Sequence, residues 1–263
     1  MPSKKRDLTL LITLIVLLIT INYNYLDNKL EKFLSTSETA HVERVIDGDT
    51  IVVDIYNKTS VRMLGINTPE RGEPYYKEAK GFLEDLVLNK TITLEYGKEK
   101  YDRYKRVLAY IYINENINVK LIENGFANFY FPSGRDVHYE DFKKSWENCI
   151  VKNINLCEKS TDKCCECIEL KKLDYKNQEV IFYNRCNFDC NLEGWKIKDE
   201  GRKNFIFDNF VLKKNKEILI KVGEEKNTDD ILYWKNEDYV WTETGDSLFL
   251  RDNSGKLVFW KNY

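Results

Sequence analysis

The sequence has no excess of charge of either sign and very little proline. Its 41 Lys and Arg residues nearly balance 43 Asp and Glu residues, giving a net charge of -2. This balance excludes the uniformly basic surface that gathers nucleic acid by charge alone. With only 4 Pro and 32% charged residues, the composition predicts a heavily ion-paired surface. Any site for a polyanion must therefore be local.

The residues that are abundant are those that build folded cores. Hydrophobic residues make up 43% and aromatic residues 13% of the 263 positions. This content excludes wholesale disorder, and the length excludes a single small module. We expect two modest domains or one large one.

The N-terminal segment has a basic flank followed by an apolar run. Lys4, Lys5 and Arg6 precede residues 8–21, which are only Leu, Ile, Val and Thr. The run is short for a membrane span of about 20 residues and matches the apolar region of a signal peptide, about 7–15 residues. Since no small-x-small cleavage site follows, the pattern favours an uncleaved signal anchor over residues 1–25.

An anchor of this kind predicts a single-pass protein of the cell membrane, with its folded part outside. The membrane is then a partner of the N-terminal segment. A cleaved signal with secretion, and a buried core helix, are the alternatives. Residues 26–40 are polar and are expected to form a linker to the first folded unit.

Strand-like alternation begins at residue 41. Residues 42–46 and 50–53 flank an Asp-Gly-Asp turn, which is typical of a hairpin. The pattern predicts further strands at residues 61–66, 91–96 and 107–113, and helices at 75–88, 119–125 and 139–151. We therefore expect a mainly β, α+β unit, an OB-fold five-stranded barrel with three helices.

A second unit is expected over residues 167–263, after a polar, cysteine-rich boundary at 159–166. It consists of short strand-like runs divided by Gly, Asn and Asp. These runs lie at residues 168–173, 179–184, 194–198, 218–222, 247–251 and 256–260. This spacing predicts a β-sandwich.

Cysteine is absent before residue 149, and Cys149 is the first of seven cysteines, all in the second half of the chain. In an exported chain they predict disulfides with one thiol left over. Cys149 with Cys157 would clamp the end of the last helix, and Cys186 with Cys190 would close a short loop. Free thiols remain possible, as does a metal site made of Cys165, Cys167, Cys186 and Cys190, although their spacing is not that of a common zinc motif.

Three residues of the first unit have the chemistry that phosphodiester hydrolysis needs. The reaction requires an activated water and neutralisation of the charge that grows on the phosphoryl oxygens. Arg62 and Arg106 stay cationic at any working pH and can bind phosphate oxygens bidentately. Glu70 can accept a proton from water.

Three sequence blocks carry a family resemblance. Residues 46–50 (IDGDT), 62–70 (RMLGINTPE) and 102–110 (DRYKRVLAY) resemble the signature blocks of the thermonuclease (staphylococcal nuclease) family, in the same order and spacing. The resemblance covers residues 41–158. It implies a calcium-dependent endonuclease that cleaves DNA or RNA and leaves 3'-phosphate ends.

The resemblance also implies residue roles. Glu70 would be the general base, and Arg62 and Arg106 would stabilise the transition state, with Arg106 assisting departure of the 5'-oxygen. The Ca²⁺ ligands would be Asp49, residue 67 and the backbone carbonyl of Thr68.

One position departs from the family pattern. The family commonly has Asp where this chain has Asn67. An amide oxygen is still a legitimate calcium ligand, so we expect weaker calcium binding rather than none.

Aromatic residues are candidates for substrate binding. Tyr104, with Arg103 beside it in the third block, and Tyr130 could stack on nucleic acid bases. Core packing is the alternative for both rings.

The second unit resembles the lamin-tail family of immunoglobulin-like domains. The resemblance rests on residues 191–199 (NLEGWKIKD) and on Trp241 through Gly255. It implies an accessory sandwich that binds an unknown ligand. Two other functions remain open for the whole chain: a catalytically inactive OB module that binds nucleic acid, and a surface structural protein.

Overall fold

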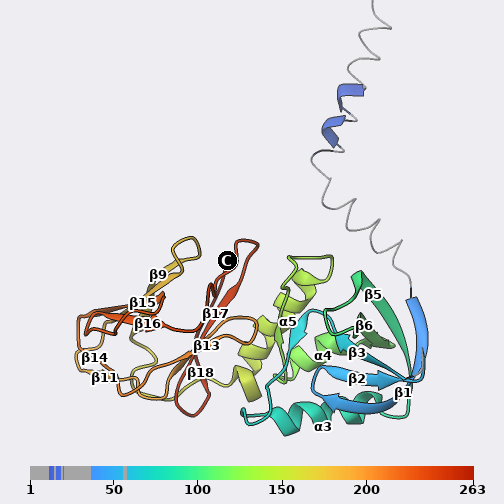
Figure 1. Cartoon of the computed structure of the whole chain (residues 1–263), viewed down its shortest axis with the longest axis horizontal. Helices are drawn as coiled ribbons and strands as arrows, with labels where there is room; N and C mark the ends of the chain where they lie inside the picture. Colours follow the sequence, from blue (N-terminus) through green and yellow to red (C-terminus); the bar gives the residue numbers. More distant parts are fainter. Residues whose placement is uncertain (1–11, 15, 19, 21–36, 56–57) are drawn as a thin grey trace, which may run out of the picture.

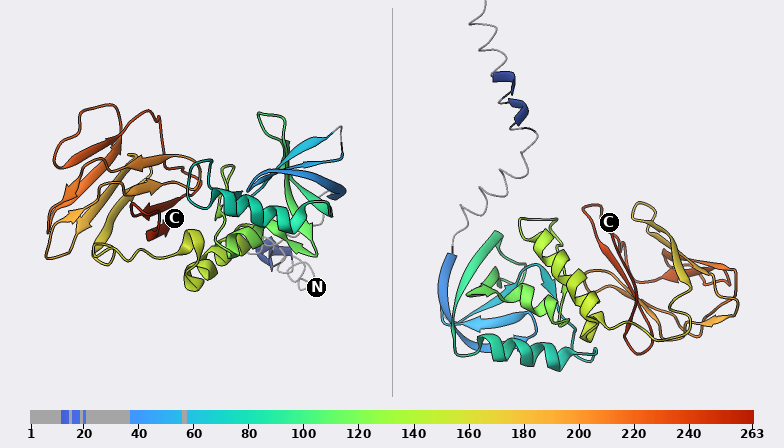
Figure 2. Two further views of the ribbon diagram at one scale, coloured as in Figure 1. Left: turned by 90° about the horizontal axis from the view of Figure 1, so that it is seen from below. Right: turned by 180° about the vertical axis from the view of Figure 1, so that it is seen from behind.

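The computed structural model describes residues 12–14, 16–18, 20, 37–55 and 58–263. From residue 37 onward they form two β-rich units that lie side by side (Figure 1, Figure 2). Most of the predicted anchor and of the predicted linker lies outside these residues. In the described part of the chain, no helix has both the length and the hydropathy to cross a membrane. The first strand begins at Ser37, four residues before the expected start of the folded unit.

The first unit, called the barrel below, is a closed sheet of five strands. Neighbouring strands pair antiparallel around it, and a parallel pairing of β3 with β6 closes the ring. The strands are β1 (Ser37–Asp47), β2 (Thr50–Val53), β3 (Thr59–Met63), β5 (Thr91–Tyr101) and β6 (Val107–Ile113). The predicted OB-type barrel is confirmed, because each expected strand is present and the ring is complete.

Helices cover the barrel where the apolar spacing predicts them. They are α3 (Tyr76–Val87), α4 (Ile117–Glu123) and α5 (Tyr139–Lys152). Helix α3 buries Ala79, Leu83 and Val87, which lie four residues apart on one face. The side chain of Asn116 caps the first turn of α4 by accepting from the Val119 amide.

Short strands complete this unit. Strand β7 (Glu115–Asn116) extends the sheet beyond β6. Strand β4 (Ile66–Asn67) pairs with β8 (Asn128–Phe129), opposing Asn67 to Asn128. This small ladder positions a residue of the candidate site.

The second unit, called the sandwich below, has two four-stranded sheets. One has the order β16, β15, β10, β9 and the other β13, β12, β17, β18. The strands are β9 (Ile168–Asp174), β10 (Glu179–Asn184), β12 (Lys196–Lys198), β13 (Asn204–Ile206), β15 (Glu217–Val222), β16 (Ile231–Trp234), β17 (Ser247–Arg251) and β18 (Leu257–Asn262), with β11 (Cys190–Asn191) paired to β14 (Val211–Leu212). The predicted sandwich is confirmed. Strands β11, β13, β14 and β16 were not predicted.

Three disulfides stabilise the described chain. Cys149–Cys157 joins the end of α5 to the 3-10 turn Asn155–Cys157, as predicted. The leftover thiol is Cys165. The other two disulfides, Cys164–Cys190 and Cys167–Cys186, both join the segment before β9 to the segment after β10.

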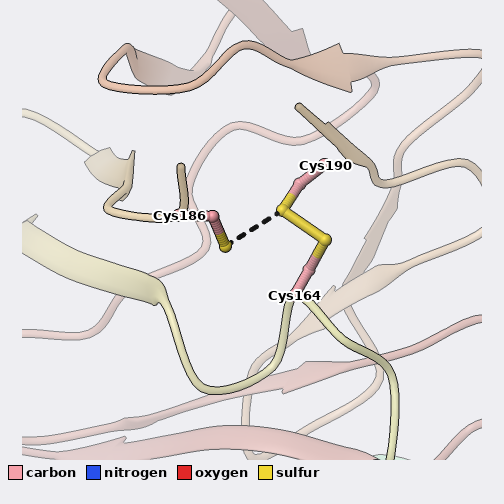
Figure 3. A group of neighbouring side chains, drawn as sticks. All are labelled: Cys164, Cys186 and Cys190. Atoms are coloured by element: carbon pink, nitrogen blue, oxygen red, sulfur yellow. Dashed lines mark hydrogen bonds between the residues drawn. A yellow bond between two sulfur atoms is a disulfide. The ribbon is translucent and has the colours of Figure 1, made fainter. Parts of the chain in front are cut away.

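The predicted Cys186–Cys190 pair is therefore wrong. The ladder of β9 and β10 opposes Ile168 to Asn184. The cysteines just before β9 therefore lie beside those just after β10, and the disulfides form between these two segments. The Cys186 and Cys190 sulfurs lie 3.5 Å apart, and Cys190 forms its disulfide with Cys164 instead (Figure 3). The alternative metal set is also wrong, because three of its four thiols are in disulfides.

The two units share a core. Phe249 and Leu257 of the sandwich are buried in the same apolar cluster as the barrel's interior. The ring of Trp146 on α5 lies edge-on to Phe249, with centroids 5.3 Å apart, and Phe129 lies edge-on to Trp260 at 6.2 Å. One apolar core therefore continues from the first unit into the sandwich.

The expected linker at 159–166 is attached to the sandwich. The Ser160 amide donates to the Leu257 carbonyl at 2.9 Å, and Lys159 forms a parallel bridge to the same residue. The connection between the units is therefore held at the last strand, β18.

Candidate active site

The turn between β1 and β2 places a carboxylate inside the barrel. The Asp49 amide donates to the Asp47 carboxylate at 3.1 Å, which tightens the turn, and Asp49 is only 4% exposed. A Cβ on Gly48 would come within 2.9 Å of Thr68, so this close approach requires glycine. Burial, together with the charge of Asp49, raises the pKa of Asp47.

Asp49 joins two of the sequence blocks. Its Oδ2 is 3.0 Å from Nη2 of Arg62, and both side chains are buried. The same oxygen accepts from the amide and the hydroxyl of Thr68, at 3.2 Å and 3.1 Å. The β2–β3 register explains the first contact, because Arg62 opposes Thr50, the residue after Asp49.

Arg106 lies at the start of β6. The next residue, Val107, pairs with Val61 across the parallel β3–β6 closure, which brings Arg106 to the same end of the barrel as Arg62. Its Nε donates to Asp102 at 2.7 Å. Burial acts to raise the pKa of Asp102, but the hydrogen bonds from the Arg106 backbone and side chain outweigh it and lower that pKa.

Tyr104 is exposed, as a base-stacking residue must be. Its ring is 64% exposed and lies between two guanidinium groups, with Arg103 Cζ 4.8 Å and Arg106 Cζ 5.4 Å from its centroid. This environment excludes core packing for Tyr104. Tyr130 differs: its ring is half-buried at the boundary with the sandwich, where a Cβ on Gly201 would lie 3.3 Å from it.

Glu70 follows the β4 strand in a loop and is about half-exposed. Its amide donates to Glu73 Oε2 at 2.8 Å. Its own Oε1 lies 2.7 Å from Nε of Arg202, a residue of the sandwich. Sequence reasoning missed Arg202, and no motif around it signals a role at this site.

Asn67 is almost completely buried, at 1% exposure. Its Nδ2 donates to the backbone carbonyls of Gly201 at 2.6 Å and Glu200 at 3.4 Å. Since both partners only accept, the amide nitrogen must face them and the oxygen must face away. Asn128, opposite in the β4–β8 ladder, also donates to the Glu200 carbonyl at 2.9 Å.

The remaining atom of Asn67 bears on metal binding. Its Oδ1 is buried and has no hydrogen-bond partner among the residues that the structure describes. An orphaned buried acceptor is costly, and a bound cation would satisfy it. Asp49, which accepts from the adjacent Thr68, and Asp47 on the same turn also offer carboxylate oxygens. This donor set fits calcium, a hard cation that takes oxygen ligands.

Three buried carboxyl groups of the sandwich, those of Asp199, Glu200 and Asp246, lie close to its contact with the barrel. Burial first, and the charge of Asp246 second, raise the pKa of Asp199 to about 7 and that of Glu200 to about 8. Burial raises the pKa of Asp246 to about 6. Glu200 accepts from the Ser247 hydroxyl at 2.8 Å and from the barrel's Phe131 amide at 3.4 Å.

Comparison with known families assigns both halves of the chain. Residues 60–157 match the staphylococcal nuclease homologue family and residues 166–263 match the Lamin Tail Domain family. The first match begins after the turn that bears Asp49, so that block lies outside it.

Individual relatives resemble less than half of the chain. The Thermonuclease of Staphylococcus hyicus is 42% identical over 109 residues, which cover 38% of this chain and 64% of that protein. The Thermonuclease of Staphylococcus intermedius is 35% identical over 130 residues, covering 46% and 77%. Endonuclease YncB of Bacillus subtilis is 34% identical over 110 residues, covering 38% and 52%.

Proposed function

Because this chain belongs to the staphylococcal nuclease homologue family and carries a Lamin Tail Domain after it, we propose that it is a calcium-dependent nuclease. It hydrolyses phosphodiester bonds of DNA, RNA or both and leaves 3'-phosphate ends. The observation that carries the proposal is the pair of contacts from Asp49 to Arg62 and Thr68, which joins the first two sequence blocks in one buried cluster.

Each residue of the site has a separate role in the proposed hydrolysis. Glu70, exposed at the mouth of the site, takes a proton from the attacking water. The water oxygen bonds to phosphorus while the bond from phosphorus to the 5'-oxygen breaks, and Arg62 and Arg106 donate to the phosphoryl oxygens as charge builds on them. Arg106 also donates to the departing 5'-oxygen, which takes its proton from solvent. Asp49, Asn67 and the Thr68 carbonyl would hold calcium, which when bound would supply further positive charge at the phosphate. Tyr104, with Arg103, stacks on a base near the cleaved bond.

We also propose that the protein acts outside the cell membrane, anchored by its N-terminal segment. The basic flank and apolar run of residues 4–21 support export. The three disulfides support an oxidising compartment. Protease added to intact cells should then digest the protein, and its recovery as a cytoplasmic species with free thiols would refute this location.

A cleavage assay tests the activity. Full-length protein is incubated with supercoiled plasmid, single-stranded DNA or RNA, in calcium or in a chelator. We expect cleavage only in calcium, and products that a polymerase extends only after phosphatase treatment, because a 3'-phosphate blocks extension. Binding without cleavage would instead identify an inactive OB module, and neither binding nor cleavage would favour a structural protein.

A further inference from the structure

A loop of the sandwich lies against the nuclease site. It comprises Lys198, the last residue of β12, and residues 199–203 before β13, and is called the site loop below. It contacts the barrel through Lys198, 3.5 Å from Glu73, through the Glu200 and Gly201 carbonyls, and through Arg202. Two of the barrel residues that it contacts, Asn67 and Glu70, belong to the candidate site.

The backbone of the site loop is held by buried contacts on both sides. Asn67 and Asn128 of the barrel donate to the Glu200 carbonyl. The Glu200 side chain accepts from Phe131 of the barrel and from Ser247 of the sandwich. Glu200 is 6% exposed and Asn67 1%. The position of residue 202 relative to the site is therefore fixed by the fold.

The side chain of Arg202, in contrast, faces solvent. It is 61% exposed, its Nε lies 2.7 Å from Glu70, and its terminal nitrogens have no partner in the described part of the chain. The other two arginines of the site are less exposed, at 9% for the side chain of Arg62 and 28% for that of Arg106. Arg62 pairs with Asp49 and donates to two backbone carbonyls, and Arg106 pairs with Asp102.

We propose that Arg202 binds a backbone phosphate of the nucleic acid beside the bond that is cleaved, so that the lamin tail domain supplies part of the nuclease's substrate site. This inference rests on the proposed function. The free guanidinium nitrogens match a phosphate bidentately. Exposed ion pairs such as that of Arg202 with Glu70 contribute little, so exchanging the carboxylate for a phosphate is easy. The exchange also frees Glu70 to accept its proton.

The test compares full-length Arg202→Ala and Arg202→Lys with a matched control, Arg185→Ala. Arg185 is 62% exposed and its Nε lies 2.9 Å from a glutamate, Glu169, but it is elsewhere on the sandwich. The kcat and KM for a single-stranded DNA of fixed length are measured over a salt series.

We expect Arg202→Ala to raise KM about tenfold at low salt with kcat within twofold. The slope of log(kcat/KM) against log[salt] should become shallower by about 0.7, the value for one phosphate contact on a single strand. Arg202→Lys should restore part of the loss because it keeps the charge, and Arg185→Ala should match the wild type. An unchanged KM and slope, or a gain of activity from an unrestrained Glu70, would overturn the proposal.

A binding measurement separates this proposal from the proposed function. Fluorescence anisotropy of a labelled single strand is recorded in chelator, where no cleavage occurs. If Arg202→Ala binds the strand more weakly than the wild type, and the wild type does not cleave in calcium, the phosphate contact is supported and the nuclease activity is refuted. Cleavage by the wild type with equal binding by both chains would refute the contact and leave the nuclease standing.

Discussion

The side-chain amide of Asn67 donates to the backbone carbonyl of Gly201 at 2.6 Å, although 134 residues separate them. The family commonly has aspartate at this position. A carboxylate there would face two carbonyl oxygens with no hydrogen to offer either. The Asn67 amide can therefore bond to the sandwich where a carboxylate could not. The side-chain oxygen of Asn67 has no partner among the described residues and faces away from the sandwich.

We expect Glu70→Gln to lower kcat by a factor of at least ~10², the scale of a general base. Folding should change little, since Glu70 is about half-exposed and in an exposed ion pair. Glu84→Gln is the control, because Glu84 also lies in an exposed ion pair, with Lys80 on α3. Turnover near the wild-type rate in folded Glu70→Gln protein would remove Glu70 from the mechanism.

Asn67→Asp should change metal binding and stability in opposite directions. The added charge should lower the calcium concentration for half-maximal activity. In chelator, the lost bonds to Glu200 and Gly201 and the facing oxygens should lower the free energy of unfolding by about 1–3 kcal/mol. Calcium titrations of activity and thermal unfolding with and without calcium measure both effects. An unchanged calcium midpoint would show that residue 67 is not a ligand.

The folded chain should become less stable as pH rises, because of three buried carboxyl groups near the contact between the two units. Asp199, Glu200 and Asp246 have raised pKa values in the folded chain, about 7, 8 and 6. Between pH 4 and pH 8, roughly, the folded chain therefore binds more protons than the unfolded chain, so the free energy of unfolding falls as pH rises. Thermal unfolding at pH 5.5 and pH 8.5 measures the loss.

Glu200→Gln should make this pH dependence shallower, because a neutral amide replaces the group with the highest of the three pKa values. Its oxygen can accept from Phe131 and its nitrogen can donate to Ser247. The exposed Glu193→Gln serves as the control. A Glu200→Gln protein with the wild-type pH dependence would show that this carboxyl does not titrate in that range.

Alkylation should count a single thiol in the native protein without reductant, and seven after reduction in denaturant. Burial, and then the charges of Glu166 and Asp162, raise the pKa of the Cys165 thiol, so its reaction should be slow at neutral pH and speed up toward alkaline pH. Cys165→Ser should abolish native labelling. Three or more native adducts would contradict the disulfide pairing.

Phe249→Ala should destabilise both units together. The ring is 2% exposed in the barrel's core cluster although it belongs to β17 of the sandwich. Its truncation should cost about 3–5 kcal/mol, and the loss should appear in one cooperative transition. Ile206→Ala, at a residue 49% exposed, is the control. Two separate transitions, with the barrel's unchanged, would show that the shared core is not cooperative.

The sequence predicted the long strands and helices because their apolar spacing is visible over several residues. Helix α3 and strand β10 are examples. Strands β11 and β14 have two residues each and β13 has three, which is too short for a period of two to be seen. The cysteine pairing depended on the register of β9 with β10, which spacing alone does not give.

Sequence motifs predicted the barrel residues of the candidate site, and the structure adds the sandwich residues that contact them. Asp49, Arg62 and Thr68 come together as their blocks suggest. The contacts of Asn67 and Glu70 with the site loop were not predictable, because they depend on how two domains pack rather than on any local pattern.

The shared core has a consequence for the chain during its synthesis. Phe249 and Leu257, which share an apolar cluster with the barrel, emerge from the ribosome after the whole barrel. About ninety residues separate the end of the barrel from Phe249, and their synthesis takes roughly 5–20 s at 5–20 residues per second. Over that interval an apolar face around Trp146 and Phe129 has no cover. Until the last strands of the sandwich are made, the barrel therefore exposes apolar surface that the folded chain buries.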